Sequence, residues 1–368
     1  MADKFRVLVA PLDWGLGHAS RCIPIIRELL YQDFEPVLGG TKESLYLLKE
    51  DFPELEYLDL PAYNIHYSES ENQLRELTTQ APRVLGVKYL EKRLFKKLIQ
   101  ARNLDAAISD NRYGIYTQKI PCIFLCHQLS IQSPATPKWF LKASNRQHRK
   151  MIQKFAECWV PDYAGENRLA GDLSKANLKI PLRYLGPLSR FQALEAKKGK
   201  AEGKIDVLIV LSGPEPQRSL LEAKLLEQIQ KIDRHFTLVQ GKAGEGKEQQ
   251  RENYRILAFM NTKELQRAFQ QAACVISRTG YSSLMDYEAL GLNRLILIPT
   301  PGQPEQEYLG EIWQKERKAI VQSQKELDLG IALKEVHDLA ERPANVNAGK
   351  ALKEAVSALK ESLISLKK

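Results

Sequence analysis

The chain has 368 residues, 43% of them hydrophobic, and a formal net charge of +9 at pH 7. A chain of this length exceeds one compact core, so two domains are expected. No stretch approaches the ~20 apolar residues that cross a bilayer, and no signal-peptide pattern precedes the first apolar run, so we expect a cytoplasmic protein and neither a membrane-spanning nor a secreted one. The five cysteines lack zinc-ligand spacing, and neither disulfides nor a structural metal is expected.

Short apolar runs alternate with helical patterns along the whole chain. The runs are rich in Val, Ile, Leu or Cys, which is typical of strands buried in a parallel sheet. A first series comprises 5–10, 35–38, 56–60, 106–109, 122–126 and 158–160, and a second comprises 206–211, 236–239, 255–258, 274–276 and 294–298. The pattern therefore predicts an α/β protein with two parallel sheets, each flanked by helices.

The two series are separated by an interruption that suggests a hinge. Residues 185–189 and the charged, glycine-containing segment 196–204 break the alternation. We therefore expect an amino-terminal domain over 1–190 and a second domain over 191–345. The remaining segment, 346–368, is expected to form a closing helix that packs back across the hinge, because four apolar residues share one helical side: Leu352, Val356, Leu359 and Leu363.

Two basic segments have the spacing of amphipathic helices. In 83–102, lysines and arginines alternate with apolar residues, and 138–154 combines basic residues with Trp139, Phe140 and Leu141. Such faces either rest on anionic membranes or are merely solvated, and both interpretations stay open. Nucleic acid is not expected as a partner, because no recognised binding motif accompanies the charge.

The loop after the first predicted strand contains Asp13, Gly15, Gly17 and His18, ahead of a helix expected over about 23–31. In an open parallel sheet, ligands bind beyond the carboxyl ends of the strands. Glycine permits backbone angles closed to other residues and leaves room for a ligand. A neutral imidazole at a helix start is a plausible general base, because the positive end of the helix disfavours its protonated form. The alternative for His18 is a turn histidine that caps the helix.

Polar residues also follow two other strands of the first domain. Asp110 follows the run 106–109, and His127 follows the run 122–126. Both are candidates for the same site, although such residues are often simple turn formers. Asp13 and Asp110 are the reserve candidates for the base, and either would otherwise orient the imidazole of His18.

The richest motif of the second domain follows the run 274–276. A strand that ends in a glycine turn directs unpaired N–H groups of the next helix toward an anion such as a diphosphate. The carboxylate of Asp286 would then accept hydrogen bonds from a ribose. Alternatively, Ser283 and Asp286 form a capping box that serves only to start the helix. The candidate binding residues here are Arg278, Gly280, Tyr281, Ser282, Ser283 and Asp286.

Together the two loops resemble nucleotide-sugar glycosyltransferases of the GT-B fold, and most closely glycosyltransferase family 28, whose best-known member is the N-acetylglucosaminyltransferase of peptidoglycan synthesis. The family's amino-terminal Gly-His loop matches residues 15–18. Its carboxy-terminal signature and its downstream proline and glutamine pair match Arg278, Gly280, Ser283, Asp286, Gly291, Pro299, Gln306 and Glu307. The chain departs from the family at Asp286, where Glu is usual, and at Glu307, where a second Gln is usual.

The resemblance implies two Rossmann-like domains facing a central cleft, with an acceptor bound by the first and a nucleotide-sugar donor by the second. The donor is expected to be a UDP-linked hexose or N-acetylhexosamine, and the acceptor is undefined. Asp286 would bind the ribose, and Gln306 and Glu307 the sugar. The diphosphate would lie near Ser212, Gly213 and Arg218, where Arg218 compensates by charge for the N–H donors that Pro214 and Pro216 lack, unless it is simply a surface arginine.

The expected reaction is an inverting transfer with His18 as the base on the acceptor hydroxyl. No Asp-x-Asp occurs in the chain, so metal-independent activity is expected, without a cofactor. A lipid-linked acceptor and peripheral contact with the inner face of an anionic membrane would suit the basic helices. Two alternatives stay open: a nucleotide-sugar epimerase or hydrolase on the same fold, and a non-catalytic subunit that binds nucleotide-sugars.

Overall fold

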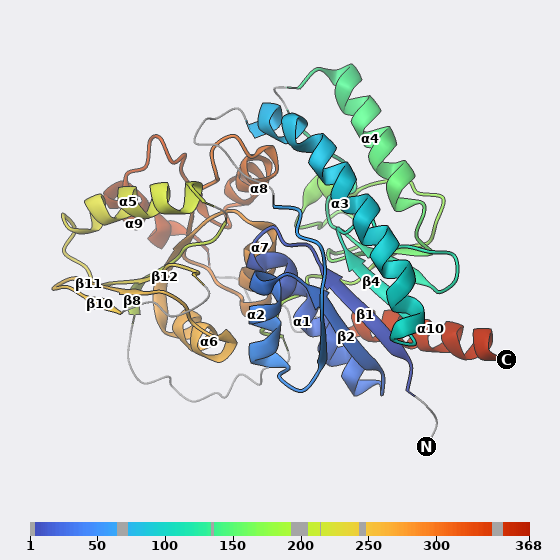
Figure 1. Cartoon of the computed structure of the whole chain (residues 1–368). Helices are drawn as coiled ribbons and strands as arrows, with labels where there is room; N and C mark the ends of the chain where they lie inside the picture. Colours follow the sequence, from blue (N-terminus) through green and yellow to red (C-terminus); the bar gives the residue numbers. More distant parts are fainter. Residues whose placement is uncertain are drawn as a thin grey trace. The chain divides into compact units, whose positions relative to one another are not determined.

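The structure is a computed structural model that describes residues 4–64, 73–133, 136–192, 205–213, 215–242, 248–340 and 349–368. The chain divides into two compact units (Figure 1). The first unit is formed by Met1–Asn64, Thr79–Gln192 and Val346–Lys368, and the second by Ile65–Thr78 and Ala193–Asn345. The predicted hinge segment 196–204 lies outside the described residues.

The first unit contains a seven-stranded sheet in which every pair of neighbouring strands is parallel. The strand order is β3-β2-β1-β4-β5-β6-β7. The strands are β1 (Arg6–Pro11), β2 (Glu35–Gly40), β3 (Glu56–Asp59), β4 (Ala106–Asp110), β5 (Cys122–Leu125), β6 (Glu157–Val160) and β7 (Leu182–Tyr184). The sequence pattern missed β7, because this edge strand has three half-buried residues with an arginine in the middle.

Helices cover both faces of this sheet. Alternate residues of a strand point to opposite faces, so Leu8 and Ala10 share one face and Val7 and Val9 the other. The first face packs against α3 (Gln73–Ala101) and α4 (Lys138–Ile152), through residues such as Phe95 and Ile152. On the other face, α1 (Leu16–Tyr31) and α2 (Lys42–Asp51) contact β2. A short 3₁₀ helix, η1 (Gly171–Ser174), completes the unit before β7.

Helix α1 begins at Leu16, and the start predicted near residue 23 was wrong. In the structure Pro24 lies inside the helix and is buried, and the apolar stripe that includes Ile23 and Ile26 extends past it. The earlier start places Gly17 and His18 in the first turn of α1.

The carboxy-terminal helix α10 (Lys350–Lys367) packs against α1 within the first unit. Its buried side contains Leu352, Val356, Leu359 and Leu363. At the end of α1, the carbonyl oxygen of Gln32 accepts a hydrogen bond from Lys360 at 2.6 Å, and its amide oxygen accepts one from Ser357 at 3.1 Å. Apolar burial and these polar contacts together attach the end of the chain to the first sheet's helices.

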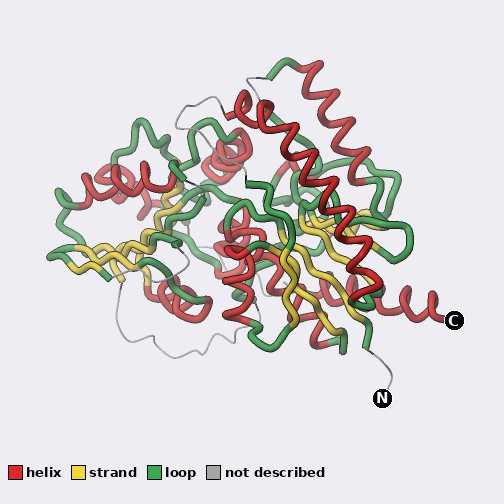
Figure 2. Tube along the Cα trace, in the orientation of Figure 1, coloured by secondary structure: helices red, strands yellow, loops and turns green. Residues whose placement is uncertain are grey.

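The second unit contains another seven-stranded sheet, in the order β10-β11-β9-β8-β12-β13-β14. All neighbouring pairs are parallel except β10 and β11. The strands are β8 (Ile205–Val210), β9 (Phe236–Val239), β10 (Gln249–Gln250), β11 (Tyr254–Leu257), β12 (Ala272–Ser277), β13 (Leu295–Leu297) and β14 (Ile320–Val321). The predicted α/β class with two parallel-dominated sheets is confirmed, and Figure 2 shows the strands in yellow among red helices.

The helices of the second unit also lie on both faces of their sheet. One face packs against α5 and α9 through a cluster that includes Leu221, Leu225 and Leu333, while α6 contacts β8 and β12. The helices are α5 (Gln217–Ile229), α6 (Thr262–Gln271), α7 (Tyr281–Leu290), α8 (Pro304–Lys315), α9 (Leu329–Glu335) and the 3₁₀ helix η2 (Val336–Asp338). None of the helices in the described ranges combines the length and apolar character that spanning a bilayer requires.

Candidate active site

The first part of the site lies at the carboxyl edge of the first sheet. Strands β1, β4 and β5 are neighbours and parallel, so the residues that follow them emerge at one edge. His18 lies in the first turn of α1 after β1, Asp110 is the last residue of β4, and His127 follows β5. The topology therefore brings together three residues that lie far apart in the sequence.

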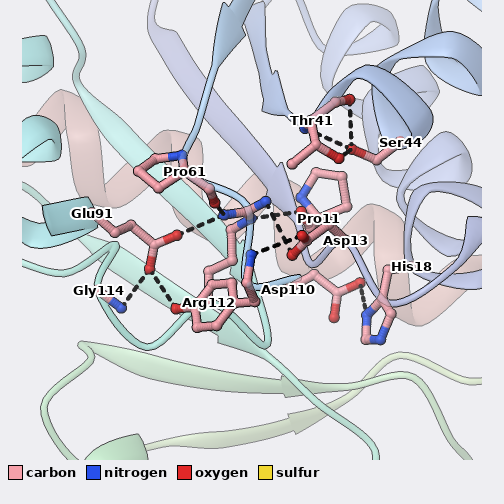
Figure 3. Close-up of polar contacts among 11 residues, drawn as sticks. Pro11, Asp13, His18, Thr41, Ser44, Pro61, Glu91, Asp110, Arg112 and Gly114 are labelled. Carbon is pink, nitrogen blue, oxygen red and sulfur yellow. Dashed lines mark hydrogen bonds and ion pairs between the residues drawn. The ribbon is translucent and has the colours of Figure 1, made fainter. Parts of the chain in front are cut away.

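His18 and Asp110 form a close pair. Nδ1 of His18 lies 3.0 Å from Oδ2 of Asp110 (Figure 3). The Asp110 side chain is fully buried, whereas that of His18 is 14% exposed. Nε2 of His18 makes no hydrogen bond to any residue that the structure describes. Of the two reserve carboxylates, Asp110 is thus the one that contacts the imidazole.

Arg21 joins this pair from the next turn of α1. Its Nε donates a 2.8 Å hydrogen bond to Oδ2 of Asp110, and its Nη2 contacts Oδ1 of the same carboxylate. Nη1 of Arg21 lies 3.2 Å from Nδ1 of the buried His127. The sequence analysis missed Arg21, because its position three residues after His18 faces the same side only if the helix has already begun.

Burial and neighbouring charges together lower the pKa values of both His18 and Asp110. Burial lowers the pKa of His18; the Asp110 carboxylate opposes this effect and the Arg21 guanidinium adds to it. Burial by itself would raise the pKa of Asp110, but Arg21 and His18 bring the pKa of Asp110 down to about 2. At neutral pH the cluster therefore contains a neutral imidazole beside an ionised carboxylate, as a general base and its orienting group require.

The glycines of this loop have different roles. Gly15 precedes α1 with φ +77°, and a Cβ at this position would meet no atom within 4 Å. Gly17, in contrast, is the second residue of α1, so the unusual backbone angle expected for it was wrong. Only Gly15 needs the conformational freedom of glycine.

Asp13 lies apart from the imidazole. Its Oδ2 accepts a hydrogen bond from the backbone N–H of Tyr63 at 2.8 Å, and its Oδ1 lies 3.7 Å from Nη2 of Arg112. Arg112 also donates to the carbonyl oxygens of Pro11 and Pro61, at 2.7 and 3.0 Å (Figure 3). Asp13 and Arg112 therefore hold together the loops that follow β1, β3 and β4.

A buried ion pair supports these loops from helix α3. Glu91 accepts a 2.7 Å hydrogen bond from Nη1 of Arg112, and both side chains are fully buried. Glu91 also accepts hydrogen bonds from the Tyr63 hydroxyl and the Gly114 N–H, both at 2.9 Å. Burial raises the pKa of Glu91, and the guanidinium of Arg112 opposes that rise. No sequence motif distinguished this pair, because it joins a helix to a loop 21 residues further along the chain.

At the carboxyl edge of the second sheet, β12 leads directly into α7. The helix begins at Tyr281 with Gly280 as its N-cap, and no side chain caps this end. Ser283 is therefore the third helical residue and Asp286 lies in the second turn, so the capping-box interpretation was wrong. Gly280 has an ordinary φ of −67°, and a Cβ there would meet nothing within 4 Å. A ligand can approach the backbone closely at this position.

The loop after the neighbouring strand β8 leads to a second helix start. Gly213 has φ +96°, Pro214 lies outside the described residues, and α5 begins at Gln217. Arg218 forms an ion pair with Glu215 at 2.7 Å and donates to the carbonyl oxygen of Gly241 at 3.2 Å. Because β8 and β12 are adjacent and parallel, α5 and α7 both begin at one edge of the sheet. Two helix N-termini at one edge suit an anion.

Arg278 lies beneath these loops and is 1% exposed. It donates to the carbonyl oxygens of Gln217 at 2.7 Å, Pro299 at 3.1 Å and Ile298 at 3.3 Å. Burial lowers the pKa of Arg278 to about 10. Its guanidinium therefore ties the end of β12 to the segment after β13 and to the start of α5.

The two residues expected at the donor sugar lie at the start of α8. Oε1 of Gln306 accepts hydrogen bonds from the N–H and hydroxyl of Thr300, both at 3.0 Å, and its Nε2 donates to Oε1 of Gln303 at 2.7 Å. Glu307 accepts a 3.1 Å hydrogen bond from the Gly302 N–H. Both side chains thus stabilise the loop that precedes α8. Ser212 lies after β8, and Asp286 is 7% exposed.

Among the described residues, no group of three or more His, Cys, Asp or Glu side chains is arranged to hold a metal ion. All five cysteines are free and buried.

Comparison with known proteins identifies the class. Residues 207–362 match the glycosyltransferase family 28 C-terminal domain. An uncharacterised glycosyltransferase of Methanosarcina acetivorans is 26% identical over 330 residues, which cover 82% of this chain and 79% of the relative.

Solved glycosyltransferases share the fold over 98% of this chain. The glycosyltransferase of kitacinnamycin has a TM-score of 0.63 at 12% identity, covering 98% of this chain and 95% of the other. The spinosyn rhamnosyltransferase SpnG, complexed with thymidine diphosphate, has a TM-score of 0.61 at 13% identity, covering 98% and 96%. MurG of Acinetobacter baumannii has a TM-score of 0.54 at 11% identity, covering 98% and 100%. The protein is a glycosyltransferase of the GT-B fold, and its residues 207–362 match the glycosyltransferase family 28 C-terminal domain.

Proposed function

We propose that the protein transfers a hexose or N-acetylhexosamine from a nucleoside-diphosphate sugar, with UDP as the nucleotide, to an acceptor hydroxyl. The transfer is inverting and needs no metal, and His18 is the base. The observation that carries this proposal is the 3.0 Å contact between Nδ1 of His18 and the ionised, buried Asp110. When Nδ1 carries the ring proton and donates it to Asp110, the imidazole presents a lone pair at Nε2.

In this mechanism Nε2 of His18 removes the proton of the acceptor hydroxyl while that oxygen attacks the anomeric carbon. The new bond joins the acceptor oxygen to this carbon, and the bond from the carbon to the diphosphate oxygen breaks. Asp110 stabilises the imidazolium that forms. The reaction requires that the two units present His18 and the donor to one another.

The departing nucleoside diphosphate carries negative charge, which the second unit is suited to receive. The N-terminus of α7 follows Gly280, where the backbone is open to a ligand, and the N-terminus of α5 begins at the same sheet edge. The structural likeness to SpnG in complex with thymidine diphosphate supports a nucleoside diphosphate as the ligand. Asp286 would bind the ribose. Gln306 and Glu307 would reach the sugar from the start of α8. Arg218 would lie near the diphosphate after its ion pair with Glu215 breaks.

We also propose that the enzyme works in the cytoplasm and that its first unit contacts an anionic membrane, which suits a lipid-linked acceptor. Helices α3 and α4 touch through Lys88 and Met151. Exposed aromatic and aliphatic side chains lie on the same two helices among their basic residues: Leu85, Tyr89, Leu90, Trp139 and Phe140. Apolar side chains interleaved with cations are typical of interfacial helices. Trp139→Glu should abolish cosedimentation with vesicles that contain an anionic lipid, and binding unchanged by this substitution would contradict the membrane contact.

The function is tested first with nucleotide-sugars alone and then with acceptors. A panel of nucleotides and nucleotide-sugars, screened by thermal shift, should raise the melting temperature selectively for one donor. With an acceptor, chelator should leave turnover intact, and NMR of the product should show the opposite anomeric configuration. Rapid formation of free sugar or of an epimer from the donor alone would favour a hydrolase or epimerase instead. Donor binding without any turnover would favour a non-catalytic subunit.

A further inference from the structure

Nδ1 of His18, the ring nitrogen that faces Asp110, has Arg21 as a second neighbour. Nδ1 of His18 lies 3.0 Å from Oδ2 of Asp110 and 2.8 Å from Nη2 of Arg21. A carboxylate only accepts hydrogen bonds and a guanidinium only donates them. Nδ1 must carry a proton to bond Asp110 and must lack one to bond Arg21. The two contacts are therefore mutually exclusive hydrogen bonds that require opposite tautomers of one imidazole.

The contacts of Arg21 favour its hydrogen bond to Nδ1 of His18 over the hydrogen bond from Nδ1 to Asp110. It already satisfies both oxygens of Asp110, through Nε at 2.8 Å and through Nη2. The carboxylate thus accepts hydrogen bonds without help from His18, and the Arg21–Nδ1 contact is the shorter of the two. Arg21 is itself 2% exposed, so water does not compete for its N–H groups.

We propose that Arg21 is a positioning residue that controls the base: it donates to Nδ1 of His18 in the free enzyme, keeps the ring neutral and holds it in the Nε2–H tautomer. The base becomes ready when Arg21 releases Nδ1, which then carries the proton and donates to Asp110, and Nε2 gains its lone pair. The proton moves from Nε2 to Nδ1 by exchange with solvent, so the ring keeps one proton throughout. This inference rests on the proposed role of His18 as the base.

The charged and titratable groups that face His18 give the direction of the pH effect. They are Asp110 at the end of β4, Arg21 on α1 and His127 after β5, and the thiol of Cys22 lies 3.8 Å from Asp110. Asp110 stabilises the imidazolium, whereas Arg21 disfavours it. Removal of the guanidinium should therefore make His18 easier to protonate and should move the acidic limb of kcat/KM to higher pH.

The test combines ¹⁵N NMR of the histidine rings with pH profiles. In ligand-free enzyme, His18, assigned with His18→Gln, should carry its proton on Nε2. In Arg21→Met, His18 should carry the proton on Nδ1. The acidic limb of kcat/KM should move to higher pH by about one unit, because removing a unit charge at this separation changes the pKa of His18 by at least that amount. Arg27→Met is the matched control: it removes another arginine of α1, one paired with Asp51 at 2.9 Å, and should change neither reading.

Each outcome decides the inference. An Nδ1–H ring in the unmodified enzyme, or an acidic limb that stays in place or falls in Arg21→Met, would overturn it. If Arg21→Met does not fold, Arg21→Lys replaces it in the test, because lysine keeps the charge but lacks the forked geometry of the guanidinium. In Arg21→Lys the ring should carry its proton on Nδ1, and the acidic limb of kcat/KM should stay nearly in place. An Nε2–H ring in Arg21→Lys would then count against the inference. The NMR readings need no turnover, so an enzyme that shows the tautomer shift but no transfer would refute the proposed function alone.

Discussion

Asp110→Asn is the substitution that probes the base assembly most sharply, because it removes a charge and keeps the size of the side chain. Two unit charges 3.0 Å apart attract by about 5 kcal/mol at an effective dielectric constant of about 20. The amide oxygen of Asn retains part of this attraction for the imidazolium. A net loss of about 3 kcal/mol lowers kcat by about 100-fold. The acidic limb of kcat/KM should also move to lower pH, since Asp110 raises the pKa of His18.

The assay is initial-rate transfer across pH, with melting temperature measured in parallel. The substitution leaves the buried Arg21 without its anionic partner, which costs about 3–5 kcal/mol of stability, so rates are compared only where both proteins are folded. Asp51→Asn is the matched control, because it also removes a carboxylate paired with an arginine of α1, and it should leave kcat unchanged. A folded Asp110→Asn enzyme with kcat within threefold of the unmodified enzyme would refute the assigned role.

Three further predictions concern the donor loop and the pH dependence of stability. Gly280→Ala should raise the KM for the donor about tenfold, because the added methyl group occupies the space proposed for the ligand. The melting temperature should change little, because the methyl group meets no protein atom and the φ of this residue is ordinary. An unchanged donor KM would place the ligand elsewhere. Burial lowers the pKa of His148 to about 4, so as pH falls this histidine is protonated in the unfolded chain before it is protonated in the folded protein. The free energy of unfolding should therefore drop by about 3 kcal/mol between pH 6.5 and 4. Urea unfolding of His148→Gln over the same pH range should lack this drop. The lowered pKa of Asp110, about 2, should add about 2 kcal/mol to the free energy of unfolding above pH 4. This contribution should be lost as pH falls toward 2, and the same titration of Asp110→Asn should not show the loss.

The sheet architecture could be predicted from the sequence because buried parallel strands leave a local trace. Apart from Arg6 and Asp206 at their starts, runs such as 5–10 and 206–211 are apolar on both faces, and each corresponds within a residue or two to a strand. Three strands at sheet edges were missed because they are too short to leave such a trace. Leu182–Tyr184 is three residues long, Ile320–Val321 is two, and Gln249–Gln250 is two residues that are also polar and exposed.

Within the candidate site, strand-end loops were predictable and side-chain partners were not. Parallel topology alone indicates that residues after β1, β4 and β5 share an edge, and this reasoning selected His18, Asp110 and His127. Which carboxylate contacts the imidazole depends on side-chain direction, so Asp13 and Asp110 could not be ranked. Arg21 was hidden by the misplaced start of α1.

Other partners are hidden because they act over long separations in the sequence. Glu91 and Arg112 form a buried pair between a helix and a loop, and neither residue belongs to a motif. Gln306 was selected as a sugar ligand, yet its amide bonds Thr300 and Gln303. Sequence motifs therefore selected the loops of the candidate site, and the structure supplied the network that supports these loops.

The central claim, that His18 is the base of a glycosyl transfer, is tested most directly by single-turnover measurements on His18→Gln with saturating donor and acceptor. The account predicts that the rate of transfer falls by about 10²–10⁴-fold while the dissociation constant of the donor stays unchanged, because His18 acts on the acceptor and not on the nucleotide. A His18→Gln enzyme that transfers sugar at the original rate would contradict the account.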